Sequence, residues 1–229
     1  YLIHYAGPTG YAHHRAAGAK WVEGLGLTVG EDDVTITAGA QHAILTTLLA
    51  NTGRNDIIAT ATHTYPGIKW ASDLLGLRLI GVEIDDGGLL PDAFERCCAK
   101  HKPKFLYCIP TLQNPTCAVL SESRRRALAE IAEKYDVAII EDEINRRLID
   151  NPPPLIRSSA PHRTYLVASL AKVVAGGLRT CYLVAPEADR ENIHRAIIGT
   201  TLMVSPLMSE LAAMWINDGT AERTIAVKR

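Results

Sequence analysis

The pattern of hydrophobic and polar positions alternates between two kinds of segment. Short, almost wholly apolar runs predict strands, and longer runs with apolar residues at helical spacing predict helices. The expected strands are Val34–Thr37, Ile57–Thr60, Leu77–Ile84, Lys104–Ile109, Val137–Glu141, Thr164–Ala168 and Thr180–Ala185. The expected helices are Ala12–Gly24, Ala40–Asn51, Gly67–Leu75, Pro91–Lys100, Glu122–Lys134, Glu187–Thr200 and Pro206–Asp218.

This order of elements predicts an α/β protein with three layers, α/β/α, around a mostly parallel seven-stranded sheet. Helices long enough to be crossover connections separate most of the strands, and such connections produce parallel strands. The runs VAIIED (137–142) and FLYCIP (105–110) are nearly continuous apolar segments, as expected for strands covered on both faces. Because ligands of such sheets bind beyond the carboxyl ends of the strands, the segments that follow the strands should carry the chemistry.

Composition narrows the classes of function. The chain has 229 residues, of which 47% are hydrophobic, and a net charge of -1, so it lacks the overall basic charge of a nucleic-acid or anionic-membrane binder. The sequence contains no apolar run of about 18 residues, so no membrane span is predicted. The eight histidines include His13-His14 but no HxxxH or HExxH, so no metal site is expected.

Five cysteines, none in CxxC spacing, favour a reducing, cytoplasmic setting. The first residue is Tyr1, and residues 225–229 resemble the inside of a helix, so the chain is expected to be a fragment of a longer protein.

Small and polar residues do follow the predicted strands. Gly39, Ala40 and Gln41 open a helix directly after a strand, where free N–H groups and the helix dipole attract an anion. Asn114, in QNPT, offers an amide, although asparagine before proline commonly only begins a turn. Asp142 ends an apolar strand and needs a cation or strong donors to remain ionised.

The stretch SLAKVVAGGLR (169–179) places Lys172 between apolar residues, with Ser169 before it and Arg179 after it. A lysine near a desolvating pocket and a second cation is suited to act as an amine nucleophile toward an aldehyde. Tyr65 adds an aromatic face in HTYPG. Together with Asp142, these groups are what an aldehyde cofactor with a phosphate and a pyridinium nitrogen requires.

Seven segments carry a resemblance to a known family: YAGPTGYAHHR, TAGAQHAI, TYPG, GLRLIGVEIDDGGLLP, PTLQNPT, IIEDE and SLAKVVAGGLRTCYLVAP. The chain resembles the class I/II aminotransferase superfamily, the pyridoxal 5'-phosphate (PLP) enzymes of fold type I, over essentially its whole length. The wording of PTLQNPT and of SLAK…GLRTCYLVAP is most similar to the aminotransferase-like domains of MocR-type transcription regulators of the GntR family. In those regulators a DNA-binding winged helix precedes this domain.

The resemblance implies a role for each candidate residue. Lys172 would form the Schiff base with PLP, and Asp142 would keep the ring nitrogen protonated. Asn114 would donate to the ring 3-oxygen, and Tyr65 would stack on the ring. The phosphate would be held by Ser169, Arg179 and the amides of Gly39, Ala40 and Gln41. Tyr5 would reach the phosphate of a partner subunit, which implies a homodimer with shared active sites.

One departure concerns the ring. Asn145 stands where the family usually has a tyrosine that donates to the ring 3-oxygen. The loss of one hydrogen bond should weaken cofactor binding by about 1 kcal/mol.

The expected domains are a PLP-binding large domain over residues 1–200, incomplete at its N-terminus, and the truncated beginning of a small domain over residues 201–229. The leading hypothesis is a transferase that moves an amino group between an amino acid and a keto acid. A second hypothesis is the effector domain of a transcription regulator, which would meet DNA only through a winged helix absent from this chain. A third is a cofactor-free relative that has lost the chemistry.

Overall fold

The computed structural model describes residues 4–229 and alternates helices with strands, as the sequence predicts. The helices are α1 (Ala12–Glu23), α2 (Ala40–Asn51), α3 (Pro66–Leu75), α4 (Pro91–His101), α5 (Glu122–Lys134), α6 (Arg190–Thr201), α7 (Pro206–Asn217) and α8 (Thr220–Lys228). The strands are β1 (Val34–Thr37), β2 (Ile57–Ala61), β3 (Arg78–Val82), β4 (Ile84–Asp85), β5 (Gly88–Leu89), β6 (Phe105–Cys108), β7 (Ala138–Asp142), β8 (Thr164–Ser169) and β9 (Cys181–Val184). The predicted elements are confirmed to within a few residues at their ends.

Seven strands form a sheet in the order β1-β9-β8-β7-β6-β2-β3, and β4 pairs with β5 in a small separate hairpin. The pairs β2/β3, β2/β6 and β6/β7 are parallel. The pair β1/β9 is antiparallel. The mostly parallel sheet is thus confirmed, and the antiparallel β1/β9 pair includes β1, the strand at one edge of the sheet.

Packing divides the chain into two compact units. Unit 1 contains the described residues 4–50, 144–150 and 167–229, and unit 2 contains residues 51–143 and 151–166. The predicted boundary at residue 200 separates a large domain from the beginning of a small domain, whereas the two units are defined by packing. The predicted boundary therefore stays a prediction.

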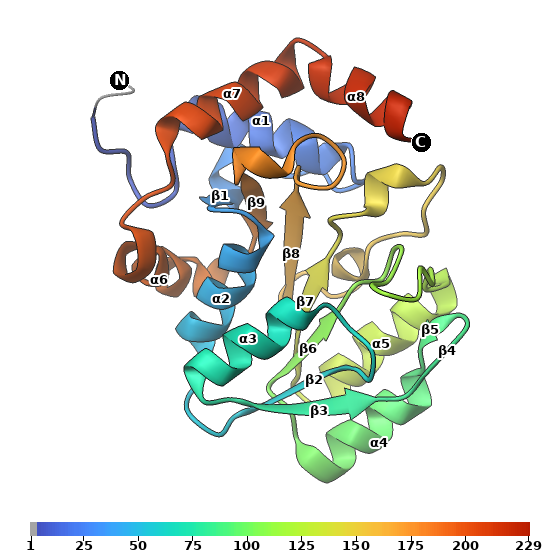
Figure 1. Ribbon diagram of the computed structural model, residues 1–229. Coiled ribbons are helices and arrows are strands. Elements are labelled where there is room, and N and C mark those ends of the chain that lie inside the picture. Colours follow the sequence, from blue (N-terminus) through green and yellow to red (C-terminus); the bar gives the residue numbers. More distant parts are fainter. Residues whose placement is uncertain (1–3) are drawn as a thin grey trace. The chain divides into compact units, whose positions relative to one another are not determined.

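The core of unit 1 forms around α1. This helix buries Trp21 and Val22 and packs against β1, β9 and α7 (Figure 1). Gly18 permits the close approach, because a side chain there would overlap the ring of Tyr182 on β9 and crowd Val34 on β1. The contact between α1 and α7 joins segments that lie almost 200 residues apart in the sequence.

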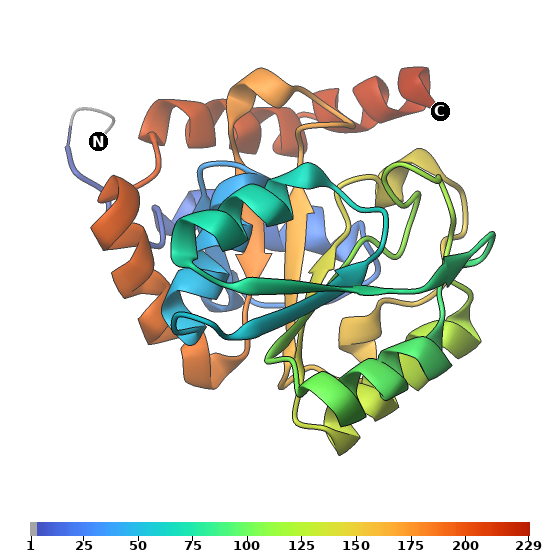
Figure 2. The same cartoon turned by 60° about the horizontal axis from the view of Figure 1, so that its bottom comes forward.

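In unit 2, α4 and α5 lie side by side (Figure 2) and share one hydrophobic core with strands of the sheet. Its fully buried members include Phe94 of α4, Leu106 of β6, Leu128 of α5 and Ile139 of β7. Cys97, Cys98 and Cys108 belong to the same core. All five cysteines are free thiols, and burial raises the pKa of Cys98 to about 12, so this thiol is unreactive at neutral pH.

No helix within residues 4–229 is both long enough and apolar enough to cross a membrane.

Candidate functional site

The carboxyl end of β7 in unit 2 carries a buried carboxylate with a buried donor. Asp142 is the last residue of the strand and is 3% exposed. The hydroxyl of Tyr107 on β6 donates to Asp142 Oδ2 at 2.8 Å. Burial and the neighbouring charge of Asp142 raise the pKa of Tyr107 well above its usual value. Tyr107 therefore remains a hydroxyl donor, and the bond stabilises the ionised form of Asp142.

The two glutamates beside Asp142 turn away from it, as strand alternation requires. Glu141 accepts the backbone N–H groups of Ile156 at 2.7 Å and Arg157 at 2.9 Å. Glu143 accepts from Arg125 Nη1 at 2.8 Å, within a fully buried ion pair. Burial and the charge of Glu143 raise the pKa of Glu141 to about 7. Glu141 therefore binds two backbone N–H groups, and Glu143 neutralises the buried charge of Arg125.

Arg125 also fixes the loop that carries Asn114. Its Nε donates to Leu120 O at 2.9 Å, and its Nη2 donates to Pro110 O and Thr111 Oγ1, both at 2.9 Å. One buried guanidinium thus ties both ends of the loop over residues 110–120 to the α5 helix, which places Asn114 beyond the carboxyl end of β6.

Inside this loop, Gln113 makes the local contacts. Its amide nitrogen donates to His63 O at 2.5 Å, and its amide oxygen accepts from the backbone N–H of Thr116 at 3.0 Å. The Asn114–Pro115 peptide bond is cis, and the Asn114 side chain is exposed. Gln113 also links the loop to the segment before α3, where the half-buried Tyr65 precedes the first helical residue.

In unit 1, the turn between β1 and α2 approaches an arginine. Gly39 has a φ of +86°, and a Cβ added there would lie 2.5 Å from Arg179 Nη2. Arg179 Nη2 also lies 3.4 Å from Ala38 O. Only glycine leaves room for the guanidinium at this turn and adopts its backbone conformation without strain. Gly39 and Arg179, two of the candidates for a phosphate site, thus lie close together within one unit.

The backbone N–H groups of this turn have different hydrogen-bonding roles. The Gly39 N–H donates to Thr37 O at 2.8 Å and is engaged in the turn itself. Ala40 and Gln41 are the first residues of α2, the end of the helix that attracts an anion. These two residues are therefore better placed than Gly39 to hold an anion at this helix end.

Lys172 lies in the turn that follows β8. Ser169, the buried last residue of the strand, accepts the Ala171 N–H at its Oγ at 3.2 Å. The expectation that Lys172 is desolvated is wrong, because the residue is exposed while Val173 and Val174 are buried. The apolar neighbours point into the core and leave the lysine outside.

A second lysine holds this turn from α8. Lys228 Nζ donates to Lys172 O at 3.2 Å and to Val174 O at 2.9 Å. The backbone of Lys172 is therefore tied to a helix 56 residues further along the chain.

The remaining candidates in unit 1 are Asn145 and Tyr5. Asn145 is half-buried and precedes a short 3-10 helix, where its carbonyl accepts the Leu148 N–H at 2.9 Å. Tyr5 is 81% exposed. The structure thus places all the predicted residues, three in unit 2 (Tyr65, Asn114, Asp142) and the others in unit 1.

Three polar residues around these candidates were missed by the sequence analysis: Tyr107, Arg125 and Lys228. Tyr107 stands in an apolar strand, which is a weak signal for a buried hydroxyl that needs a partner. Arg125 lies within Arg124-Arg125-Arg126, where nothing in the sequence separates the buried residue from its exposed neighbours.

Comparison with known proteins identifies relatives along the whole chain. The family model for class I and II aminotransferases matches residues 3–227. The HTH-type transcriptional regulator YdeF of Bacillus subtilis is 34% identical over 200 residues, which are 87% of this chain and 43% of that protein. The mitochondrial kynurenine/alpha-aminoadipate aminotransferase of Bos taurus is 29% identical over 84% of this chain and 49% of that protein. The chain thus spans less than half the length of these relatives.

Solved structures show the same fold. An archaeal alanine:glyoxylate aminotransferase superimposes with a TM-score of 0.91 at 25% identity, covering 97% of this chain and 57% of the other. The alpha-aminoadipate aminotransferase LysN of Thermus thermophilus, complexed with N-(5'-phosphopyridoxyl)-L-leucine, gives a TM-score of 0.90 at 26% identity, covering 100% and 59%.

Proposed function

Because the chain belongs to the class I and II aminotransferase family, we propose that it is the PLP-binding part of an aminotransferase, with Lys172 as the residue that binds the cofactor covalently. LysN, which is 26% identical to this chain, is complexed with a phosphopyridoxyl compound, and this supports the choice of cofactor. The substrates would be an amino acid and a keto acid, as for the aminotransferase relatives.

The single observation that carries the proposal is the approach of Arg179 to Gly39. The backbone at Gly39, which carries no side chain, lies beside the Arg179 guanidinium and the first turn of α2. This arrangement fits a phosphate group. Arg179, Ser169 and the amides of Ala40 and Gln41 would hold that phosphate. The donors fit because all of them can present N–H or O–H groups to an anion.

The resemblance to the family assigns the cofactor ring to residues of unit 2. Asp142, which accepts a hydrogen bond from Tyr107, would keep the pyridine nitrogen protonated in its ionised form. Asn114 would donate to the ring 3-oxygen, and Tyr65 would stack on the ring face. Asn145 would take the place next to the 3-oxygen where the family usually has a tyrosine.

When bound, PLP supplies an electron sink that weakens the bonds at the substrate Cα. Lys172 Nζ would then accept the proton from that carbon and return it at the neighbouring carbon, acting as base and then as acid. Lys228 would help to position this amine by holding the backbone of the turn.

Visible absorbance tests the proposal. The purified full-length protein should develop the band of lysine-bound PLP, and Lys172→Ala should abolish it. Lys69→Ala, which removes an exposed lysine of α3 paired with Asp73, is the matched control and should keep the band. A band unchanged in Lys172→Ala, or no band in the wild type, would refute the role of Lys172.

A second candidate function is favoured by one observation. Three of the relatives, YdeF, YdfD and YisV of Bacillus subtilis, are HTH-type transcriptional regulators. The domain would then sense PLP or its amino-acid adduct and do little net transamination. A winged-helix segment in the natural protein, and DNA binding that changes with PLP or amino acid, would support this function. Turnover of amino acids without any effect on DNA binding would refute it.

A homodimer with shared active sites also remains a proposal. The exposed Tyr5 is available to reach a partner subunit. Sedimentation should show a dimer, and Tyr5→Phe should lower PLP affinity without changing that dimer. A monomer that binds PLP with unchanged affinity would refute it.

A further inference from the structure

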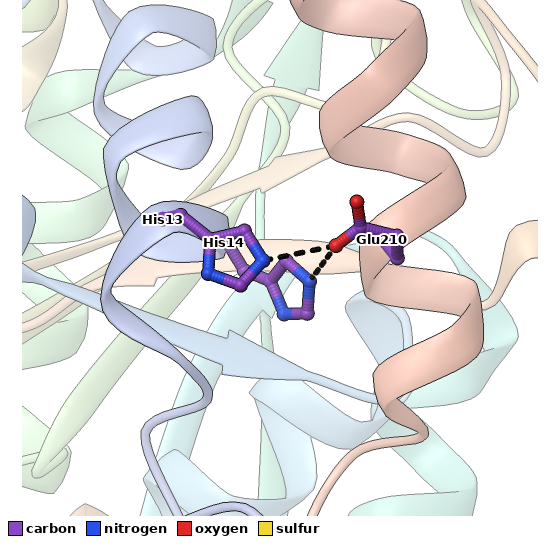
Figure 3. A group of neighbouring side chains, drawn as sticks. All are labelled: His13, His14 and Glu210. Atoms are coloured by element: carbon purple, nitrogen blue, oxygen red, sulfur yellow. Dashed lines mark hydrogen bonds and ion pairs between the residues drawn. The ribbon is translucent and has the colours of Figure 1, made fainter. Parts of the chain in front are cut away.

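Two adjacent histidines and a glutamate converge in unit 1, outside the residues of the proposed cofactor site (Figure 3). His13 and His14 lie on α1, and Glu210 lies on α7. His13 Nε2 is 2.9 Å from Glu210 Oε2, and His14 Nε2 is 2.7 Å from the same oxygen. The two imidazole rings are 4.1 Å apart between their centroids.

This convergence is unusual for neighbouring residues of a helix. Successive side chains on a helix point about 100° apart, yet both rings present Nε2 to a single carboxylate oxygen. All three ligand atoms lie within 4.8 Å of one another. The cluster therefore has one focal point, as a site for a bound cation requires.

The three side chains of the cluster differ in exposure. The His14 side chain is 1% exposed, against 52% for His13 and 24% for Glu210. His14 is therefore enclosed by the packing of unit 1, and solvent reaches the cluster on the side of His13.

We propose that His13 Nε2, His14 Nε2 and Glu210 Oε2 form a site for a divalent transition-metal ion of the zinc class. Two imidazoles and one carboxylate are a ligand set that zinc accepts at about 2.0–2.2 Å. Those bond lengths place neighbouring ligand atoms about 3.3 Å apart in a tetrahedron, so the side chains need only small rotations. His13, the most exposed of the three side chains, would make the larger rotation.

The surroundings leave room for a fourth ligand. An open surface pocket adjoins the cluster and is lined by His13, Glu210, Ala213, Met214, Asn217 and Asp218. Water can enter there and complete the coordination. The metal would bridge α1 to α7, two helices that already pack together, and would stabilise unit 1 by binding the folded state alone.

From the sequence alone no metal site is expected here, because His13-His14 lacks the HxxxH spacing. The third ligand lies 196 residues away, so only the packing of α1 on α7 reveals it.

Zinc titration of the chelator-treated protein tests the proposal. The Cys117→Ser background is used throughout, because the exposed Cys117 thiol would also bind zinc. We expect one equivalent of Zn²⁺ per chain, with affinity lowered at least tenfold by His13→Ala and by Glu210→Gln. Co²⁺ in place of Zn²⁺ should show the visible absorption of a four-coordinate site.

The matched control is His162→Ala. His162 Nε2 lies 2.9 Å from Glu133 Oε2, the same pair without a second histidine, so its loss should leave zinc affinity unchanged. His13 is exposed, and its replacement should leave the fold intact, as near-ultraviolet circular dichroism would show. Zinc should raise the Tm of the wild type and of Lys172→Ala, but not that of His13→Ala.

Absence of saturable zinc binding, or equal affinity in the wild type, His13→Ala and Glu210→Gln, would overturn the proposal and leave a hydrogen-bonded cluster. Because Lys172→Ala retains the metal site and loses the PLP band, failure of one proposal is distinguishable from failure of the other.

Discussion

The Tyr107 hydroxyl donates to Asp142 Oδ2 at 2.8 Å, and both side chains are buried. Tyr107 lies opposite Ile140 in the parallel β6/β7 pair, so it shares a face with Asp142 two residues further on. A buried carboxylate is costly without donors, and β6 supplies one of them. The orientation of the candidate ring-nitrogen partner is therefore determined by the neighbouring strand.

Tyr107→Phe should destabilise the protein by about 1–3 kcal/mol, because it removes a hydrogen bond to a buried carboxylate. Urea unfolding measures the loss. The matched control is Tyr182→Phe, because the buried Tyr182 hydroxyl has no hydrogen-bond partner within residues 4–229. Its removal should be neutral or stabilise the protein by about 1 kcal/mol. Equal effects of the two variants would contradict the role of the Tyr107 bond.

Arg125→Met should lower the free energy of unfolding by about 3–5 kcal/mol, because it leaves Glu143 buried without its cationic partner. It should also loosen the loop over residues 110–120, which hydrogen exchange of that segment would report. Arg126→Ala, at the exposed neighbouring position, should change stability by no more than about 0.5 kcal/mol. A loss below about 1 kcal/mol for Arg125→Met would show that the buried Arg125 contacts contribute little to stability.

Gly39→Ala should weaken PLP binding more than tenfold, because the new methyl group would displace the Arg179 guanidinium. It should also cost about 1–2 kcal/mol of stability at a positive φ. Fluorescence titration with PLP and urea unfolding measure the two effects. Gly199→Ala, with nothing within 4 Å of the added Cβ, should leave PLP affinity unchanged and stabilise α6 by about 0.5–1 kcal/mol. Wild-type PLP affinity in Gly39→Ala would contradict the proposed phosphate site.

The pKa of Glu141, raised to about 7, predicts a contribution to pH dependence. Between about pH 4.5 and 7 the folded state binds more protons at this group than the unfolded state does. The Glu141 contribution to the free energy of unfolding should therefore fall as pH rises through this window, and be constant above it.

Urea unfolding at about pH 5, 6, 7 and 8 measures this slope as the difference between the wild type and Glu141→Gln. The difference is needed because histidines titrate in the same range. Glu130→Gln, at an exposed position of α5, should keep the wild-type slope. A Glu141→Gln slope equal to that of the wild type would contradict the raised pKa.

Much of the fold follows from local pattern. The predicted bounds of Val34–Thr37, Ala40–Asn51 and Glu122–Lys134 match the structure to the residue, because the apolar periods there end at clear turn or capping residues. The β4/β5 hairpin was missed, since two-residue strands have no measurable period. The antiparallel pairing of β1 with β9 was also beyond the sequence, because a strand has the same hydrophobic pattern in either orientation.

The sequence by itself determined which segments become helices or strands, and it placed the candidate residues at the ends of the strands. It did so because side-chain period and turn chemistry act over a few residues. Only the tertiary structure decided that Tyr107 meets Asp142, that Arg125 is the buried arginine of its triplet, and that Glu210 joins His13 and His14. These pairings depend on strand register and helix packing, which bring together groups 18, 35 and 196 residues apart and which no local pattern encodes.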